Sequence, residues 1–535
     1  MNTDLNQLTP EIIMLVGAGL VALMGLARQD AVRQGGQWVT LGALALAFIS
    51  GLSLCDVGDK QGWTLWPLAT YDTLLSAGIG ILLVLSSWDM PFENDPSRTD
   101  KPYRCEFFAL LLCSLAGVSM IAKVDNLIWL FLALELTSIP TYIMVAIGRG
   151  NPGAHEAGVK YFFLGALSAA IYLFGFSYLY GFAGSTDFSV IKTMFQTASS
   201  GGHISYIALI GLLTVAVGIS FKIAAFPLHY YAPDVYQGAA APVTSFLSFA
   251  PKAAGFFALI MVFNLNSWTL TMGNPVDPLS DILLLLAAMT MTLGNVLALL
   301  QRDIKRIMAY SSIAHSGYML VGLGIGPIIA TSIVNGVPQS VSSPANGISA
   351  ALFYLGGYSL MTTGFFAVLI YFQGTLGAAE DLDDIAGIAA EHPLAAACMT
   401  VCLLSLIGMP FTVGFLGKLF IVQAALAGGH PLMAVIVVLN AAIAAAYYLR
   451  MIAVMYLRDA WAPFSLRNIW ALKTAAVLAT GLVVIFGLFP SLLLNMSANS
   501  GLAVGNYLQN NYQPPMADKP VKSAAPTKPL ALSEN

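Results

Sequence analysis

The chain has 535 residues, of which 58% are hydrophobic and only 9% carry a charged side chain. Soluble domains usually carry roughly 25% charged residues, so a water-soluble protein of this size could not cover its surface with so few. This composition, together with a mean hydropathy of +0.77, excludes a cytosolic enzyme, a nucleic-acid-binding protein and a disordered scaffold. The formal net charge of -4 indicates little about partners.

Long apolar runs define the fold class, because a membrane-spanning helix needs roughly 20 apolar residues. The strict alternation of apolar and polar residues that is typical of outer-membrane strands is missing from these runs. The first run lacks a small-residue cleavage site, so we expect a span and not a removable signal peptide. We therefore predict an all-α polytopic membrane protein with about fourteen transmembrane helices, near residues 10–27, 38–55, 72–87, 106–122, 126–147, 158–181, 204–230, 240–264, 279–300, 305–325, 346–373, 393–428, 431–457 and 469–496.

Positively charged residues are divided unequally between the two sets of loops. Loops after the odd-numbered runs hold Arg28, Arg33, Arg98, Lys101, Arg104, Arg149, Arg302, Lys305, Arg306, Arg458, Arg467 and Lys473. Loops after the even-numbered runs hold only Lys60, Lys123 and Lys192. Because cytoplasmic loops carry an excess of lysine and arginine, this bias predicts an even number of helices and both termini outside the cytoplasm.

Two polar segments stand apart from this pattern. One predicted cytoplasmic loop, 380–391, is acidic and holds Glu380, Asp381, Asp383, Asp384 and Glu391. It is either a solvated loop or a docking surface for a partner subunit. The residues after about 502 combine lysines with proline, alanine and serine, which predicts a disordered tail over 502–535.

Six ionisable side chains inside the predicted spans are candidate site residues, namely Glu135, Lys160, Lys222, Lys252, His315 and Lys418. An ionisable residue at the bilayer centre costs roughly 2.5–3.5 kcal/mol, and such residues usually face a bundle interior or mark an ion pathway. Lys160 lies near the start of its span, and Arg450 lies near the cytoplasmic end of its own, so either side chain could instead extend to the membrane surface. His315 could instead be a hydrogen-bonded core residue.

Two predicted spans are interrupted by proline and glycine, and each of them carries a lysine. The seventh run contains Lys222 and Pro227, and the twelfth contains Pro410 and Lys418. Because a membrane tolerates broken helices where the freed backbone groups line a cavity or are buried in protein, these breaks indicate functional positions. Their separation by five spans predicts two inverted five-helix repeats, an architecture typical of ion translocators. The expected parts are 1–105 (three helices), 106–270 (first repeat), 271–460 (second repeat), 461–501 (last helix) and 502–535 (tail).

The six ionisable residues predict proton transfer. Desolvation favours the neutral form of a buried lysine, whereas a nearby carboxylate favours its charged form. Moving the carboxylate therefore switches the lysine between holding and releasing a proton. The cysteines lack iron–sulfur or zinc spacing, and no dinucleotide-binding fingerprint follows a strand. We therefore expect no cofactor in this chain, and redox chemistry only in another one.

Three segments resemble the signatures of the antiporter-like subunits of respiratory complex I: 160–166, 221–243 and 302–315. The resemblance covers nearly the whole chain. Tyr231 and Ala240 depart from the tryptophan and the proline that relatives often have, and both lie in the loop beyond the broken helix.

This resemblance implies fourteen helices, with Glu135 and Lys222 as the coupled pair of a first half-channel. It also implies that Lys252 is a connecting lysine and that Lys418 is the lysine of a second half-channel. FMN, iron–sulfur clusters and quinone would be bound by other subunits, and the partners would be other membrane-arm subunits and the lipid bilayer, not nucleic acid. We expect a multi-pass protein of the bacterial inner membrane with both termini in the periplasm.

Two alternatives stay open. The same family supplies subunits to Mrp-type cation/proton antiporters and to membrane-bound hydrogenases. A purely structural membrane-arm piece is a third possibility, although all the expected membrane lysines are present.

Overall fold

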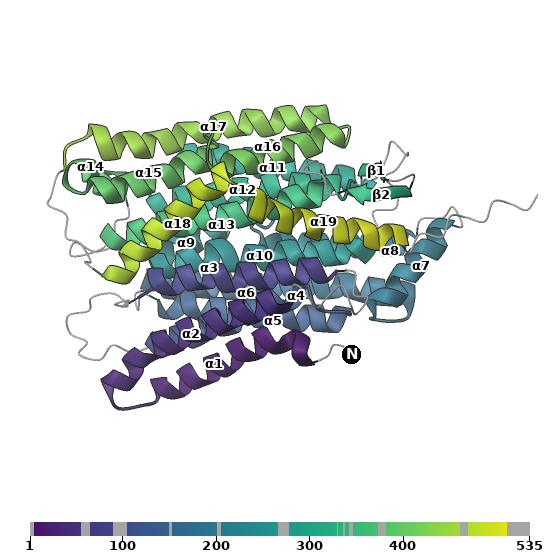
Figure 1. Cartoon of the computed structure of the whole chain (residues 1–535), viewed down its shortest axis with the longest axis horizontal. Coiled ribbons are helices and arrows are strands. Elements are labelled where there is room, and N and C mark those ends of the chain that lie inside the picture. Colours follow the sequence, from purple (N-terminus) through teal and green to yellow (C-terminus); the bar gives the residue numbers. More distant parts are fainter. Residues whose placement is uncertain are drawn as a thin grey trace, which may run out of the picture.

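The computed structural model describes residues 5–54, 65–88, 104–148, 152–200, 205–265, 278–328, 330–334, 337–341, 346–372, 381–460 and 469–510. Within these ranges the chain forms a bundle of long helices (Figure 1). Ten of the helices are long and apolar enough to cross a membrane, and four more are shorter and apolar. The prediction of an all-α polytopic membrane protein is confirmed.

The N-terminal half begins with a short 3-10 turn, Leu5–Leu8, and continues with helices that match the first eight predicted runs. These helices are α1 (Thr9–Gly25), α2 (Asp30–Leu54), α3 (Trp66–Ser86), α4 (Arg104–Ile121), α5 (Leu127–Ile147), α6 (Pro152–Ala183), α7 (Phe188–Ser200), α8 (Tyr206–Lys222), α9 (Ala232–Gly238) and α10 (Ala241–Leu265). Two of them, α7 and α9, are short helices that the apolar runs did not predict.

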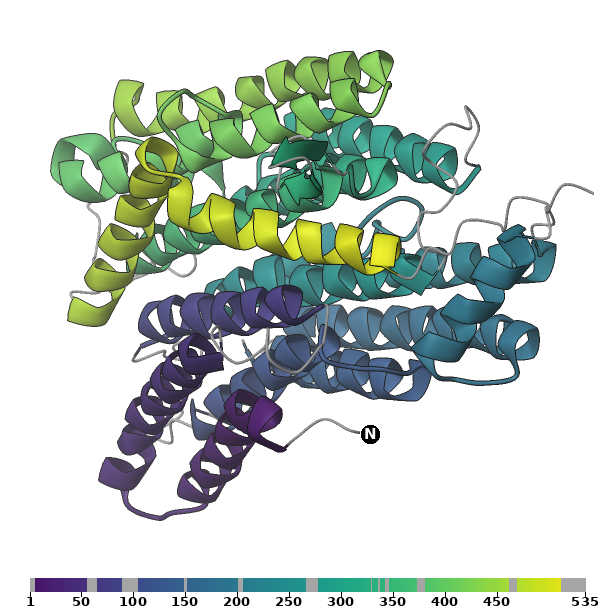
Figure 2. The ribbon, with the colours of Figure 1, turned by 45° about the vertical axis from the view of Figure 1, so that its right-hand side comes forward.

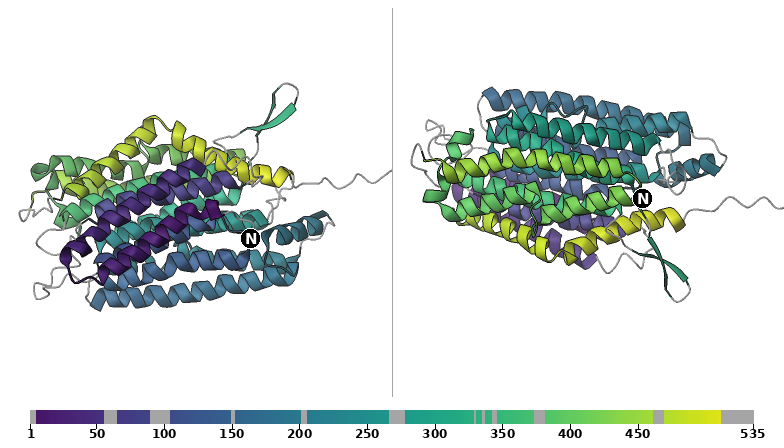
Figure 3. Two further views of the ribbon diagram at one scale, coloured as in Figure 1. Left: turned by 60° about the horizontal axis from the view of Figure 1, so that its bottom comes forward. Right: turned by 90° about the horizontal axis from the view of Figure 1, so that it is seen from above.

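The C-terminal half contains the remaining helices and one hairpin. Its elements are α11 (Pro278–Leu299), α12 (Ile304–Ile325), β1 (Ala330–Val334), β2 (Val337–Val341), α13 (Gly347–Phe372), a 3-10 turn (Leu382–Ile385), α14 (Ile388–Glu391), α15 (Pro393–Ile407), α16 (Val413–Ala427), α17 (Pro431–Leu457), α18 (Trp470–Leu488) and α19 (Ser491–Asn510). The strands β1 and β2 pair antiparallel and project away from the helices (Figure 3).

Helices α10 and α13 form the centre of the bundle. Every residue of α10 is buried, and Tyr371 is the single exception in α13. In α2, α6 and α18, by contrast, only 33% of an apolar stretch of 18 residues is buried. Because the outer helices present apolar side chains to their surroundings, polar side chains of the spans gather inside, against α10 and α13.

Both predicted breaks are present. The seventh run ends as a helix at Lys222 and resumes as α9, and the twelfth is divided into α15 and α16. At the first break Ala224 has a positive φ of 52° and the Phe226–Pro227 peptide is cis, and at the second break Gly408 has a φ of 95°. A proline cannot donate a backbone hydrogen bond, so neither helix continues through its break.

The last predicted span is also divided, which the apolar pattern did not indicate. Pro490 separates α18 from α19, and the described part of α19 continues to Asn510, beyond the expected start of the tail at 502. Residues 511–535 lie outside the described ranges. Helices α18 and α19 cross over α3 and α13 and so connect the two halves of the bundle (Figure 2).

The chain ends and connections separate into two ends of the bundle. The α1–α2 turn and α14 lie at one end, and the N-terminus, α7 and the hairpin lie at the other (Figure 1). Arg28 lies in the α1–α2 turn at the first end, and Arg302 and Arg458 lie there beside the turn Leu382–Ile385. Lys192 lies in α7, at the other end. Lys60, Arg98, Lys101, Arg149 and Arg467 lie outside the described residues. Which end faces the cytoplasm stays a prediction, as do the part boundaries.

Candidate functional site: a buried line of ionisable side chains

Glu135 and Lys222 face each other between α5 and α8. The Lys222 Nζ lies 3.7 Å from the Glu135 Oε1, and the side chains are 3% and 20% exposed respectively. Lys222 also donates to the Ser138 hydroxyl and to the Leu134 carbonyl. Tyr172 of α6 donates to the same Glu135 oxygen. The carboxylate is therefore held between a lysine and a tyrosine, both of them ready donors.

Lys252 lies next in the line, in the middle of α10. Its Nζ donates to the Ser312 carbonyl of α12 and lies 4.7 Å from the centre of the Tyr358 ring. Ser316, one turn further along α12, donates to the carbonyl of Ile223, the residue after Lys222. One turn of α12 therefore contacts both lysine-bearing segments.

His315, which is on α12, lies between two tyrosine hydroxyls from other helices. Its Nδ1 is 2.7 Å from the Tyr354 hydroxyl, and its Nε2 is 3.1 Å from the Tyr448 hydroxyl. Because one imidazole nitrogen can donate while the other accepts, this arrangement can pass a proton between the two hydroxyls. The same geometry also satisfies a hydrogen-bonded core histidine, which was the alternative.

Lys418 on α16 is held by the second helix break. Its Nζ donates to the carbonyls of Leu406 (2.8 Å) and Ile407 (2.9 Å), and it lies 5.0 Å from the centre of the Tyr318 ring. These carbonyls are the last of α15, where the helix dipole carries partial negative charge. The break therefore supplies for Lys418 the negative potential that Glu135 supplies for Lys222.

Lys160 is placed apart from these residues. Its side chain is 45% exposed, and its Nζ lies 2.7 Å from Glu156 and 3.2 Å from Asp234. It therefore lies at one end of the bundle, at the surface, as its alternative interpretation expected. The structure brings together the other five predicted site residues and leaves Lys160 at their edge.

Two of the motifs that carry the family resemblance are in direct contact. Arg306 donates to Asp234 and to Gln237 at 2.9 Å each. Lys305, which is fully buried, donates to the carbonyls of Gln237 and Ala239, at the end of α9. The short helix α9 is thus fixed to the start of α12, and the polypeptide that follows Lys222 is held in place.

Several charged residues that the sequence pattern places in loops or at the surface are buried or paired in the structure. Lys305 was counted as a loop residue but caps α9. Lys123 was also counted as a loop residue, but it is 4% exposed and forms an ion pair with Glu11 at 2.6 Å. Arg450 caps α11 by donating to the Leu299 and Gln301 carbonyls. The partners are distant in sequence, so no local pattern could have indicated these contacts.

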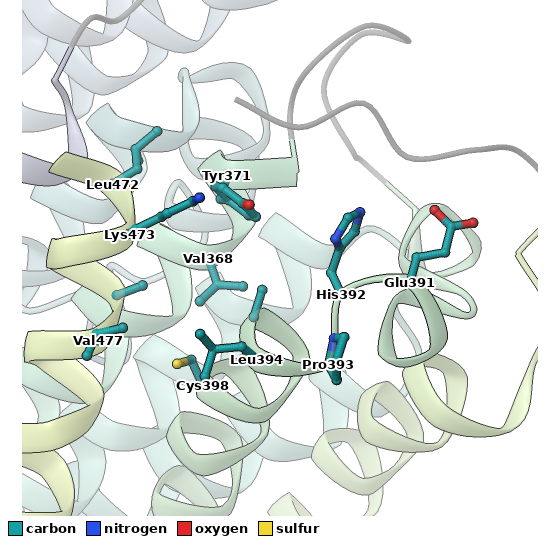
Figure 4. Close-up of a pocket in the computed structure, with 12 residues that line it drawn as sticks. Val368, Tyr371, Glu391, His392, Pro393, Leu394, Cys398, Leu472, Lys473 and Val477 are labelled. Carbon is teal, nitrogen blue, oxygen red and sulfur yellow. The ribbon is translucent and has the colours of Figure 1, made fainter. Parts of the chain in front are cut away.

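Part of the acidic loop lies within the described residues. Asp383 forms an ion pair with Arg458, and its side chain is 70% exposed. Asp381 and Asp384 form a capping box around the short turn Leu382–Ile385. Glu380 lies outside the described residues. Nearby, a cavity of about 270 Å³ opens between α13, α15 and α18, with Tyr371, His392 and Lys473 among its lining residues (Figure 4).

Gly255 brings α10 close to Lys222. A Cβ at this position would lie 2.4 Å from the Ile223 Cγ2 and 3.4 Å from the Lys222 Cβ. We expect Gly255→Val to displace Lys222 from Glu135 and to lower proton translocation on the order of tenfold, because a misplacement of about 1 Å can cost up to 10² in rate. Proton uptake by vesicles that contain the assembled complex measures this.

Gly481→Val is the matched control, since nothing lies within 4 Å of a Cβ at Gly481. Equal translocation by the Gly255 and Gly481 variants would show that the separation of Lys222 from Glu135 does not matter.

The site and the fold define a helical membrane protein with an internal line of ionisable side chains, and comparisons identify its family. Residues 124–444 match the family described as "NADH:quinone oxidoreductase/Mrp antiporter, TM". The chain belongs to this family. The resemblance expected from the sequence motifs is therefore confirmed.

Relatives with a known name agree with this assignment. NADH-quinone oxidoreductase subunit N of Desulfitobacterium hafniense is 36% identical over 508 residues, which cover 93% of this chain and 98% of that protein. Subunit N of Rhodospirillum rubrum is 34% identical, with 91% and 94% covered.

Solved structures share the fold. A chain of respiratory complex I from Thermus thermophilus with bound aureothin is 29% identical, with a TM-score of 0.71 and coverage of 92% of this chain and 100% of that chain. A chain of the Mrp complex from Dietzia sp. DQ12-45-1b has a TM-score of 0.77 at 17% identity, covering 94% of this chain and 98% of that one. The second likeness concerns the fold alone.

Proposed function

We propose that this chain is a proton-translocating membrane-arm subunit of a NADH-quinone oxidoreductase, of the subunit N type, in a bacterial inner membrane with both termini in the periplasm. The observation that carries the proposal is the line of ionisable groups that runs from the half-buried Glu135 through the buried Lys222, Lys252 and His315 to Lys418. Ionisable residues inside a membrane are expensive, and they usually mark proton or ion pathways. The identity to subunit N relatives supports the partner subunits that the proposal implies.

Proton transfer along the line follows from elementary electrostatics. Lys222 keeps its proton while Glu135 is ionised and close, because opposite charges at short distance favour both charged forms. When Glu135 is neutralised or moves away, Lys222 passes its proton towards Lys252. His315 and its two tyrosine hydroxyls then connect Lys252 with Lys418. Lys160, at the surface beside Asp234, lies at the edge of the proposed pathway.

Redox chemistry is assigned to other subunits in this proposal. In the part of the chain that the structure describes, no group of three or more His, Cys, Asp or Glu side chains could hold a metal ion. FMN, iron–sulfur clusters and quinone would then be bound elsewhere, and this chain would act as one subunit of the translocase. Its own contribution is the movement of protons.

The alternative is a subunit of an Mrp-type cation/proton antiporter or of a membrane-bound hydrogenase. The likeness to the Mrp complex chain favours this alternative as a fold, but its identity of 17% is half of that to the subunit N relatives. We therefore place it second.

Isolation of the intact assembly separates the two functions. Membranes are extracted with a mild detergent, separated on a native gel, and the band with this chain is analysed by mass spectrometry. We expect flavin and iron–sulfur subunits in the band. A band with small membrane subunits alone would contradict the proposal and favour the antiporter.

A further inference from the structure

A second group of buried ionisable residues lies among the first four helices, away from the line described above. Glu11 of α1, Asp72 of α3 and Lys123, just after α4, are 1%, 0% and 4% exposed. All three lie near the helix ends that the positive-charge distribution predicts to face away from the cytoplasm. The proposed function uses none of them.

Hydrogen bonds join these residues into one group. The Lys123 Nζ lies 2.6 Å from the Glu11 Oε1 and donates to the Gln7 carbonyl at 3.2 Å. Ser119 donates to the same Glu11 oxygen. We call Glu11, Asp72 and Lys123, with the hydroxyl residues between them, the α1–α3–α4 cluster.

The hydroxyl residues lead from Glu11 to Asp72. Ser119 lies 3.0 Å from the hydroxyl of Thr73, the neighbour of Asp72 in the chain. Ser76 donates to the Asp72 Oδ1 at 3.3 Å. Among the described residues, the second carboxylate oxygens, Glu11 Oε2 and Asp72 Oδ2, are buried and have no hydrogen-bond partner.

The charges of this cluster do not balance. Among the described residues, two ionised carboxylates and one ammonium carry a net charge of minus one, and all three side chains are at most 4% exposed. A buried charge without a partner costs several kcal/mol, and a buried carboxyl group normally binds a proton in preference to bearing that cost. Tyr71, beside Asp72, donates its hydroxyl to the Leu352 carbonyl and supplies no positive charge.

We propose that the α1–α3–α4 cluster is a proton-binding site that holds one proton on its carboxylates, mainly on Asp72. Asp72 is the acceptor because Glu11 already has the short contact with Lys123, whereas Asp72 receives neutral donors, the Ser76 hydroxyl and the Ala122 backbone N–H. The unpartnered Asp72 Oδ2 is the atom that would carry the proton, and protonation makes the whole cluster neutral.

The site is separate from the Glu135–Lys222 pair. Helix α4 lies between them, and its opposite face contacts α5 closely. There, Ser114 donates to the Thr137 carbonyl at 2.8 Å, and a Cβ at Gly117 would lie 2.6 Å from the Thr137 nitrogen. The N-terminal segment would therefore carry a proton of its own, one helix away from the proposed pathway.

Charge balance predicts a distinct infrared result for each variant of the intact complex. Asp72→Asn leaves Glu11 and Lys123 as a neutral pair. Glu11→Gln leaves Asp72 and Lys123 as a neutral pair. Each variant should therefore lose the absorption of one protonated carboxyl group per complex. Lys123→Met removes the positive charge and should gain the absorption of one further protonated carboxyl. The spectra are compared with the unaltered complex in sodium-free buffer.

Asp234→Asn serves as the control, because Asp234 is paired with Arg306 at the surface of the bundle and should change no protonated band. If Lys123→Met fails to assemble, the two isosteric amide variants, Asp72→Asn and Glu11→Gln, still test the proposal. Retention of the full protonated absorption by both amide variants would overturn the proposal. Thermal stabilisation by sodium ions that Asp72→Asn abolishes would also overturn it, because this result would show that the cluster binds a sodium ion in place of the proton. The infrared readout does not depend on proton pumping. The proposed proton-binding site can therefore be disproved while the proposed function still holds.

Discussion

Lys418→Met is expected to lower proton translocation by the assembled complex by about tenfold or more. A barrier that rises by only ~1.4 kcal/mol already slows a step tenfold. The substitution removes the charge that the Leu406 and Ile407 carbonyls stabilise, while it keeps nearly the same side-chain length. Acidification measured with a pH-sensitive dye in NADH-energised vesicles checks this prediction.

Lys473→Met is the matched control for that experiment. Lys473 is an exposed residue near one end of α18, 6.0 Å from the Tyr371 ring, and lies outside the buried line. We expect the complex with Lys473→Met to translocate protons as well as the unaltered complex. If Lys418→Met and Lys473→Met behaved alike, the second half of the proposed pathway would have to be abandoned.

Gly317→Leu is expected to cause a large loss of stability. A Cβ at Gly317 on α12 would lie 2.5 Å from the Met291 Cγ and 2.7 Å from the Met291 backbone nitrogen on α11. Overpacking of a well-packed core usually costs about 1–3 kcal/mol. Because the backbone of α11 must move here, we expect a value at the upper end of this range, measured as a lower midpoint of thermal unfolding in detergent.

Gly481→Leu tests whether the size of the new side chain alone causes that loss. Position 481 has open space around a Cβ, so its unfolding midpoint should stay close to that of the unaltered protein. Gly294 makes the reciprocal contact, 2.7 Å from the Ala314 nitrogen, and its leucine variant should behave like Gly317→Leu. Similar midpoints for the Gly317 and Gly481 variants would contradict the close approach of α11 and α12.

The sequence predicted those features of the fold that depend on local composition. Apolar runs located the helices, because the length and hydrophobicity of a span are properties of neighbouring residues. Pro227 and Gly408 predicted the breaks beside Lys222 and Lys418 for the same reason. Pro490 indicates the division of the last run in the same way, although the apolar pattern alone predicts one span there.

The burial of Glu135 and Lys222 could also be predicted, since both lie far inside apolar runs. Their ion pair could be expected only through the family resemblance, because the residues are 87 positions apart in the chain. The partners of Lys123 and Lys305 were missed because a lysine at the end of an apolar run looks the same whether it points to solvent or into the bundle. Glu11 lies 112 positions from Lys123, and no periodicity links them.

The number of protons translocated per electron by the complex with Lys222→Ala tests the central claim most directly. Complexes with and without the substitution are reconstituted in vesicles, and proton uptake and NADH oxidation are recorded together. The proposed pathway predicts an assembled complex with a lower ratio, because Glu135 loses the lysine with which it exchanges charge. An unchanged ratio in the assembled variant would contradict proton transfer through Glu135 and Lys222.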